Sequence, residues 1–277
     1  MALIALTGAS GRIATALRPR LRAAGHRLVL CDAPDAVGDA LRDVDPATER
    51  VVEADLRDID AHASAFAGAD LVVHLGAHSD ERPWDEILAV NIDGTRAVCE
   101  AARLAGVGRM LLASSVHAAG YVPVDSPRAR EGMPLPAPDT YYGVSKAALE
   151  AIGGLYAGRF AMTVVSARIM TFDDRPGGPR SLQSWLSPDD MTRLVLAALT
   201  TGVPGHHVVW GVSRNTRRVV DLAPGLAIGF DPQDDAEAHA SEVERRDPSR
   251  PPGVLGGSFA DTAYVLGEPH GGTRPGP

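Results

Sequence analysis

Cysteine is scarce in this chain. Cys31 and Cys99 are its only two cysteines in 277 residues, and they form neither the spacing of a metal site nor a framework of disulfide pairs. Both lie in apolar stretches, where cysteine usually serves as a small buried hydrophobe. The sequence therefore predicts no metal centre and no disulfide scaffold.

Long apolar runs and clusters of basic residues are also missing. No stretch approaches the roughly 18 apolar residues of a membrane helix, and the N-terminal residues MALIALTGAS lack the basic leader and cleavage site of a signal peptide. The formal net charge is −8, whereas nucleic acids and anionic membranes attract clustered Lys and Arg. We therefore expect no nucleic-acid or membrane partner, and the cytoplasm as the compartment.

Over residues 1–120 the sequence alternates short apolar runs with helical patterns. Continuous Val- and Leu-rich runs are typical of strands buried on both faces of a parallel sheet. Their alternation with helices predicts an α/β fold, a Rossmann-type doubly wound parallel sheet with right-handed crossovers. Pro19 falls inside the first helical pattern and is expected to kink that helix. The expected strands are 2–6, 27–32, 50–56, 70–76 and 109–115, and the clearest helices are 13–25 and 91–106.

The second half of the chain continues the alternation with longer loops. We expect residues 1–240 to form one domain, with a small C-terminal substrate-binding lobe contributed by about 171–232. Residues 241–277 form a polar C-terminal tail with too little apolar surface to fold alone, of which the GGSF stretch at 256–259 is the part expected to dock on the core. The expected elements are a loop over 121–139, a helix over 145–159, a strand over 162–170, a Gly/Pro loop over 171–180, a helix over 188–201 and a strand over 206–212.

A glycine-rich turn joins the first strand to the first helix. In TGASGRIA (7–14), Gly8 permits a tight turn, Gly11 lets the backbone approach a pyrophosphate, and Ala14 allows close helix–strand packing. The helix N-terminus adds N–H groups and a positive dipole for phosphate. Asp32 ends the second strand, where a carboxylate binds the adenosine ribose hydroxyls and repels a 2′-phosphate. The pattern predicts a dinucleotide site that prefers NAD to NADP.

Other residues at strand ends complete the expected cofactor site. The third strand ends beside the adenine and the fourth along the middle of the dinucleotide, because ligands of open α/β sheets bind at the carboxyl ends of strands. The predicted cofactor residues are Gly8, Ser10, Gly11, Arg12, Ile13, Asp32, Asp55, Leu56, Leu75, Gly76, Ala77, Asn91, Tyr142 and Lys146.

A Tyr-x-x-x-Lys pair follows at the start of a predicted helix. Tyr142 and Lys146 are four residues apart and share one helix face. A free tyrosine has a pKa of about 10, so a tyrosine that acts as a base near pH 7 needs a neighbouring positive charge, which Lys146 can supply. Ser115 ends the fifth strand and would donate a hydrogen bond to the reacting oxygen. We predict Ser115, Tyr142 and Lys146 as the catalytic set.

Together these motifs resemble the extended short-chain dehydrogenase/reductase family, the NAD-dependent epimerase/dehydratases. The resemblance covers about residues 3–232 and is carried by the glycine loop, Asp55, Asn91 in NIDGT, ASS (113–115) and YGVSK (142–146). It implies that Asn91 supports Lys146 through a water or a backbone group. It also implies self-association, since relatives are commonly oligomeric.

Four further stretches are similar to the uronate dehydrogenase branch of that family: 74–95, 114–121, 180–190 and 229–240. This similarity implies NAD-dependent oxidation of a hexuronic acid, of galacturonate or glucuronate type, at the anomeric carbon to an aldarolactone. Arg180 would grip the substrate carboxylate with two hydrogen bonds. Val116 replaces an Asn of the branch and Met170 a Gly, which leaves the preferred sugar acid open. The implied substrate contacts are Ser79, Ser115, Val116, His117, Thr171 and Arg180.

Two other functions stay open at this point. A sugar-nucleotide epimerase or dehydratase, or another aldose oxidoreductase of the family, would share the glycine loop and the Tyr/Lys pair. The 60 or so residues after 171 leave little room for a nucleoside diphosphate beside a sugar. A non-catalytic NAD-sensing protein would be expected to have lost Tyr142 or Lys146, and both are present.

Overall fold

The computed structural model describes residues 1–38, 41 and 43–269. Seven parallel strands form one sheet in the order β3-β2-β1-β4-β5-β6-β9, the order of a doubly wound Rossmann sheet. The predicted fold class is therefore confirmed. The last eight residues of the predicted tail, 270–277, lie outside the described part of the chain. The strands are β1 Leu3–Thr7, β2 Arg27–Asp32, β3 Glu49–Glu53, β4 Leu71–His74, β5 Arg109–Ser115, β6 Thr163–Ile169 and β9 His206–Gly211.

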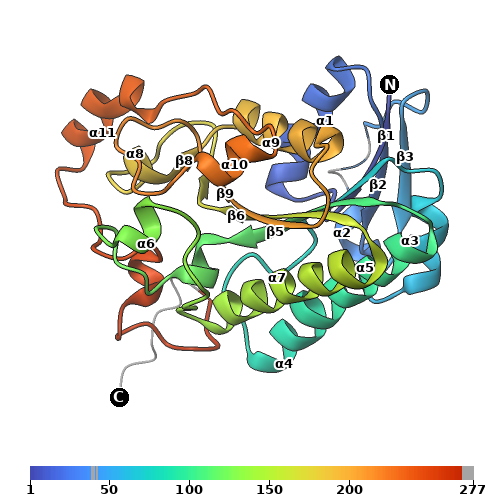
Figure 1. The fold of residues 1–277 in the computed structure, drawn as a ribbon, viewed down its shortest axis with the longest axis horizontal. Helices are drawn as coiled ribbons and strands as arrows, with labels where there is room; N and C mark the ends of the chain where they lie inside the picture. The colour runs from blue at the N-terminus through green and yellow to red at the C-terminus, as the bar shows by residue number, and fades with distance from the viewer. Residues whose placement is uncertain (39–40, 42, 270–277) are drawn as a thin grey trace.

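Helices cover both faces of this sheet (Figure 1). Successive residues of β1 point to opposite faces, so Ile4 and Leu6 pack with α1 (Arg12–Ala23) and α9 (Pro188–Thr200). Ala5 packs on the other face with α3 (Ile59–Phe66), α5 (Gly94–Leu104) and α7 (Tyr141–Phe160). The sheet is thus buried on both faces, which explains why its strands are almost continuously apolar.

α1 contains Pro19 in its interior, and a kink there stays a prediction. α7 differs from the expectation in where it starts. α7 begins at Tyr141 rather than 145, because the Thr140 side chain accepts a hydrogen bond of 3.0 Å from the Gly143 N–H and caps the helix four residues earlier. Tyr142 and Lys146 therefore both lie in the first two turns.

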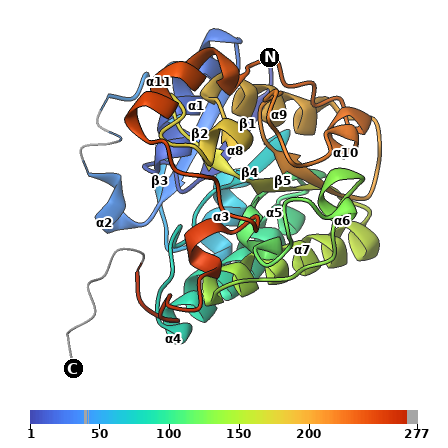
Figure 2. The same ribbon diagram turned by 90° about the vertical axis from the view of Figure 1, so that its left-hand side faces the viewer.

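Apart from α9 and β9, the chain after residue 170 forms short elements, most of which lie beside the carboxyl ends of the strands (Figure 2). The stretch 171–180, expected as a loop, contains β7 (Thr171–Phe172), which pairs in parallel with β8 (Trp185–Leu186). Other short elements are α2 Pro34–Val37, α4 Trp84–Glu86, the π-helix η2 Ile87–Asp93, η3 Val116–Ala119, α6 Pro127–Arg130, α8 Ser181–Ser184, α10 Ala223–Ala227, η4 Ala236–His239, α11 Ala240–Arg246 and η5 Gly257–Ala260. No helix in the described ranges has the length and apolar character that crossing a bilayer requires.

Residues 247–269, the C-terminal segment, return to the core after α11. Val254 bridges to Pro123, Leu255 is buried, and the Gly267 N–H donates to the Glu81 carboxylate at 2.9 Å. In both ribbon views the segment passes from α11 towards the start of α7. The GGSF stretch docks as expected, beside the end of β5.

Candidate active site

A cavity of about 680 Å³ lies at the carboxyl ends of β1, β2, β3 and β4. Its wall combines the glycine turn after β1 with residues at or just after the ends of the other three strands. The predicted residues that line it are Gly8, Ser10, Gly11, Arg12, Ile13, Asp32, Asp55, Leu56, Leu75, Gly76, Ala77 and Ser79, and Ala33, Asp35, Ala36, Arg57, His78 and Val90 join them.

The glycine turn depends on the missing side chain of Gly8. This residue has a φ of +66°, and a Cβ here would lie 2.7 Å from the Gly76 Cα. Gly11 caps α1 without any side-chain hydrogen bond. The N–H groups of the first turn thus face the cavity with no side chain to satisfy them, an arrangement that binds phosphate.

Asp32 supplies the negative charge of the cavity. Its Oδ2 accepts hydrogen bonds from the Ser10 N–H at 2.8 Å and the Ser10 hydroxyl at 2.5 Å, which fixes the carboxylate against the glycine turn. A 2′-phosphate would meet this carboxylate directly, whereas ribose hydroxyls can donate to it. The donor set therefore fits NAD.

The catalytic set lies next to this cavity and is buried. Ser115, Tyr142 and Lys146 are all less than 10% exposed. The Lys146 Nζ donates to the Ala113 carbonyl at 2.8 Å and lies 5.4 Å from the centre of the Tyr142 ring. Ser115 ends β5, and Tyr142 and Lys146 lie in the first two turns of α7. The fold thus brings together the three residues that the sequence predicted.

Burial controls the pKa values of this set. It raises the pKa of Tyr142 to about 12, against the opposing hydrogen bond from Ser115, and lowers the pKa of Lys146 to about 8. The sequence led us to expect a lowered tyrosine pKa, and in the cofactor-free chain it is higher instead, because desolvation penalises the phenolate. Deprotonation of Tyr142 thus requires more positive charge than Lys146 alone provides.

The buried Lys146 charge should appear in the pH dependence of stability. Between about pH 8 and 10.5 the unfolded chain holds a proton that the folded chain has lost, so the free energy of unfolding rises with pH over this window. Relative to Lys146→Met, we expect the wild type to gain about 2 kcal/mol between pH 7.5 and 9.5. Denaturant titrations over this range measure the gain, and parallel curves for the two proteins would contradict the burial cost.

Arg180 is held between Thr171 and the C-terminal segment. Its Nη1 donates to the Thr171 hydroxyl at 3.2 Å and its Nη2 to the Leu255 carbonyl at 2.6 Å. Burial lowers its pKa, against the opposing charge of the Asp139 carboxylate, and no carboxylate in the described ranges lies within ion-pair distance of it. The Ser184 hydroxyl, which the sequence did not single out, holds Thr171 at 2.7 Å. Arg180 is thus a partly buried cation whose partners are neutral.

His117 and Val116 follow Ser115 but point to different surroundings. The His117 ring lies between Tyr142 and Phe259, with centroid distances of 5.7 and 4.3 Å. Val116 is buried in an apolar cluster with Trp210, and Met170 packs at the edge of that cluster. The Val116 side chain is therefore too deeply buried to make the expected contact with the sugar. The His117 ring, in contrast, faces Tyr142.

Comparison with known proteins identifies the relatives of this fold and site. Residues 4–172 match the model of the NAD dependent epimerase/dehydratase family. The chain belongs to this family. The uronate dehydrogenase of Pseudomonas syringae pv. tomato is 38% identical over 248 residues, which are 86% of this chain and 84% of that protein. The NAD-dependent glucose-6-phosphate dehydrogenase of Haloferax volcanii is 34% identical over 260 residues, 88% of this chain and 98% of that protein.

Solved structures agree with this assignment. A uronate dehydrogenase from Agrobacterium tumefaciens, a tyrosine-to-alanine variant complexed with NAD, superposes with a TM-score of 0.83 at 33% identity. The match covers 96% of this chain and 99% of that chain. Like the other epimerase/dehydratase family members, this protein is an NAD-dependent enzyme, and the cavity at the glycine turn has the donors that NAD needs.

Two buried polar residues of this family member organise the start of α7 from outside the NAD cavity. Asn91, on the π-helix η2, exchanges hydrogen bonds with the His78 backbone at 2.8 and 3.0 Å and donates to the Ser145 hydroxyl at 3.1 Å. Asn91 thus binds the backbone of His78, whereas the resemblance implied a water or a backbone group that supports Lys146. No described contact joins Asn91 to Lys146. Neither Asn91 nor Tyr142 or Lys146 lines the cavity itself.

Glu81 is a residue that the sequence analysis missed. Its fully buried carboxylate accepts hydrogen bonds from the N–H groups of Tyr141 at 3.2 Å, Tyr142 at 2.7 Å and Gly267 at 2.9 Å. A carboxylate at a helix N-terminus also interacts favourably with the helix dipole. Glu81 fixes the backbone of Tyr142 and the end of the C-terminal segment together, and only the three-dimensional structure brings these residues into contact.

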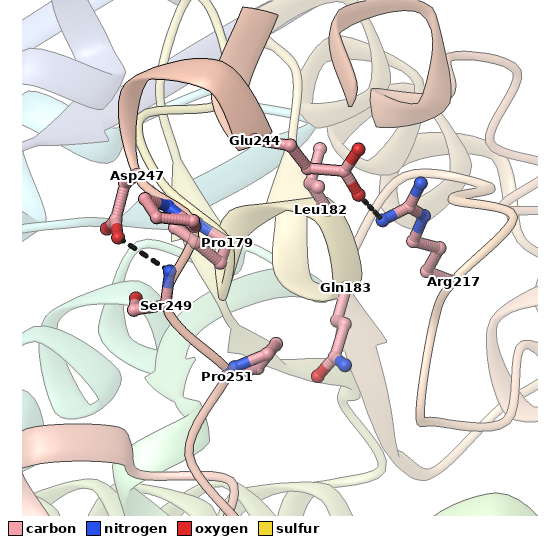
Figure 3. Close-up of a pocket in the computed structure, with 9 residues that line it drawn as sticks. Pro179, Leu182, Gln183, Arg217, Glu244, Asp247, Ser249 and Pro251 are labelled. Carbon is pink, nitrogen blue, oxygen red and sulfur yellow. Dashed lines mark hydrogen bonds and ion pairs between the residues drawn. The ribbon is translucent and has the colours of Figure 1, made fainter. Parts of the chain in front are cut away.

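A second cavity, of about 400 Å³, lies between α8 and α11 (Figure 3). Its charged side chains are already paired: Arg217 donates to Glu244 at 2.6 Å, and the Asp247 carboxylate accepts from the Ser249 N–H at 2.9 Å. Prolines 179, 248 and 251 form much of the remaining wall. Its two carboxylates are thus already engaged, and none of Ser115, Tyr142 and Lys146 lines it.

Proposed function

We propose that this protein is a dehydrogenase that oxidises a hexuronic acid, such as galacturonate or glucuronate, at the anomeric carbon with NAD, giving an aldarolactone. The single observation that carries the substrate assignment is the Arg180 guanidinium, a partly buried cation without a carboxylate partner beside the catalytic set. A desolvated cation requires an anion, and the carboxylate of a uronic acid supplies it. The relatives named uronate dehydrogenase support the same substrate class.

Each residue of the set has a distinct part in this reaction. Tyr142 takes the proton of the anomeric hydroxyl, and Ser115 donates a hydrogen bond to the same oxygen. The Lys146 charge would favour the phenolate of Tyr142, and its ammonium would bind the nicotinamide ribose. NAD, when bound, would supply the hydride acceptor and further positive charge. Arg180, Thr171, Ser79 and His117 orient the sugar, so that its reacting carbon is presented in one pose.

A screen of substrates tests the assignment. We expect NADH formation, followed by absorbance, with galacturonate or glucuronate, and a kcat/KM at least about 100-fold lower with galactose or glucose, because the neutral sugars leave Arg180 unpaired. A preference for neutral or phosphorylated aldoses would favour a sugar dehydrogenase such as the Haloferax relative. No net NADH from any free sugar would favour an epimerase or dehydratase, which keeps its NAD bound and recycles it.

The division of labour along the chain is part of the proposal. Residues 1–240 would form the NAD-binding unit, with 171–232 contributing the substrate lobe through Thr171 and Arg180. Beyond 240 the C-terminal segment adds Leu255 and Phe259 to the same side of the site. Its removal after residue 246 should therefore reduce turnover of the sugar while NAD still binds.

Self-association through α5 and α7 is a further part of the proposal. These helices lie side by side on one face of the sheet and expose three large apolar side chains: Leu104 at 53%, Leu155 at 57% and Phe160 at 42%. Such a surface is typical of an interface. Light scattering should give a multiple of 29.0 kDa, and a monomer mass would exclude this arrangement.

We place the protein in the cytoplasm. Both cysteines are buried and unpaired, as is usual in a reducing compartment, where disulfides are rare. The proposed reaction also needs a supply of NAD. Cell fractionation tests this location.

A further inference from the structure

The Asp139 carboxylate occupies a closed position beside His117. Its side chain has 0% exposure, and its Oδ2 lies 2.7 Å from the His117 Nδ1. The other oxygen, Oδ1, accepts a hydrogen bond from the Thr140 hydroxyl at 3.2 Å. Asp139 was not singled out in the sequence because it precedes α7 in a Pro-rich loop.

Two glycines make room for this carboxylate. A Cβ on Gly120 would lie 1.8 Å from Asp139 Oδ2, and a Cβ on Gly256 would lie 2.0 Å from it. Gly120 follows η3 and Gly256 belongs to the C-terminal segment, so two distant parts of the chain close around the same oxygen. The cradle allows the carboxylate one position, and that position is at hydrogen-bond distance from the imidazole.

The hydrogen bond decides which nitrogen of His117 carries the proton. A carboxylate can only accept, so Nδ1 must be the donor, and in a neutral ring Nε2 is then an acceptor. Within the described ranges no protein atom hydrogen-bonds to Nε2, and the ring retains 13% exposure. Phe259 and Tyr142 pack against the ring and prevent it from turning freely.

We propose that Asp139 is a positioning residue for the sugar oxidation: it fixes a proton on His117 Nδ1 and the ring in one orientation, so that Nε2 accepts a hydrogen bond from a sugar hydroxyl. Asp139 itself is too deeply enclosed to meet the substrate. The proposal rests on the proposed function, because it assumes a polyhydroxylated substrate beside Tyr142. It assigns His117 as an acceptor, complementary to the donors Ser115 and Arg180.

A double-mutant cycle tests whether Asp139 acts through His117. We expect Asp139→Ala to lower kcat/KM for the best uronic acid about 10- to 100-fold, as the loss of a hydrogen bond to a charged group does. Asp139→Asn keeps an acceptor oxygen and should restore most of this loss. In the His117→Ala background, Asp139→Ala should lower kcat/KM by less than about a further 3-fold, because the residue that Asp139 positions is gone. An equal loss in both backgrounds would overturn the proposal.

A matched control separates positioning from structure. Thr140→Val removes the other hydrogen bond of Asp139 and the cap of α7 but leaves the His117 contact. It should lower the melting temperature without changing the coupling between residues 117 and 139. Coupling that vanishes in Thr140→Val would show that the pair reports only on the helix start, and would count against the proposal.

The tautomer can be read without any turnover. In nitrogen-15 NMR of the whole protein labelled at histidine, the His117 ring should be protonated at Nδ1 alone in the wild type. Protonation at Nε2, or at both nitrogens near pH 7.5, would overturn the proposal even if Asp139→Ala does not fold. If the wild type oxidises no uronic acid but shows the Nδ1–H form, the proposed substrate fails while the positioning of His117 stands.

Discussion

Tyr142→Phe is expected to lower kcat for the uronic acid by about 10²- to 10⁴-fold, the range that general acid–base groups contribute. The substitution removes one hydroxyl and keeps the ring that packs against His117. Because the Glu81 carboxylate holds the backbone N–H of Tyr142, the start of α7 should be unchanged. NAD affinity, measured by calorimetry, should therefore stay within about 3-fold of the wild type, since the ring and the glycine turn remain.

The adjacent tyrosine provides a matched control. Tyr141 lies in the same first turn, but its ring packs against Trp84, at a centroid distance of 5.4 Å, outside the catalytic set. Tyr141→Phe should leave kcat within about 2-fold. A Tyr142→Phe enzyme as active as Tyr141→Phe would exclude the phenol as the base. If both variants and the wild type bind NAD alike and none turns over any aldose or uronate, the protein is an NAD sensor.

Arg180→Ala is expected to cost about 2–4 kcal/mol of transition-state binding with uronic acids, about a 30- to 900-fold loss in kcat/KM. The loss follows from the proposed pairing, since the substrate carboxylate would then be desolvated without a cation. Neutral aldoses lack the carboxylate, so their low kcat/KM should change little. The measurement is the ratio of uronate to aldose activity for the wild type and the variant.

Two further variants sharpen this test. Arg180→Lys keeps the charge but cannot donate two parallel hydrogen bonds, and should fall between the wild type and Arg180→Ala. Arg217→Ala removes a guanidinium of the same lobe whose partners are Glu237 and Glu244. It should leave the ratio unchanged. A ratio that is the same for Arg180→Ala and the wild type would rule out Arg180 as the carboxylate clamp.

The sequence predicts the sheet well because its signals are local. Each buried strand is a continuous apolar run, and the runs at 27–32 and 109–115 coincide with β2 and β5. The glycine turn is equally local, since Gly8 and Gly11 act on the backbone next to them. The pair β7–β8 escaped prediction because each strand has only two residues, too few for any periodicity. The sequence also did not predict Thr140 as the N-cap of α7, because a Pro-rich loop precedes it.

The proximity of Tyr142 and Lys146 was predictable from their spacing, and their surroundings were not. Tyr142 and Lys146 are neighbours on one helix, so sequence alone places them together. Glu81 contacts the Tyr142 backbone across 61 residues of chain, and Asp139 contacts His117 across 22. The sequence around Glu81 and Asp139 gives no sign of these contacts. The raised pKa of Tyr142 was missed for the same reason, because burial is a property of the folded chain.

The C-terminal segment has a consequence for the order in which the enzyme is assembled. The glycine turn, Asp32 and the strands around them leave the ribosome long before residues 255–259, which enclose the sugar side. The contacts that Leu255 and Phe259 make with Arg180 and His117 can therefore form only when almost the whole chain has been synthesised.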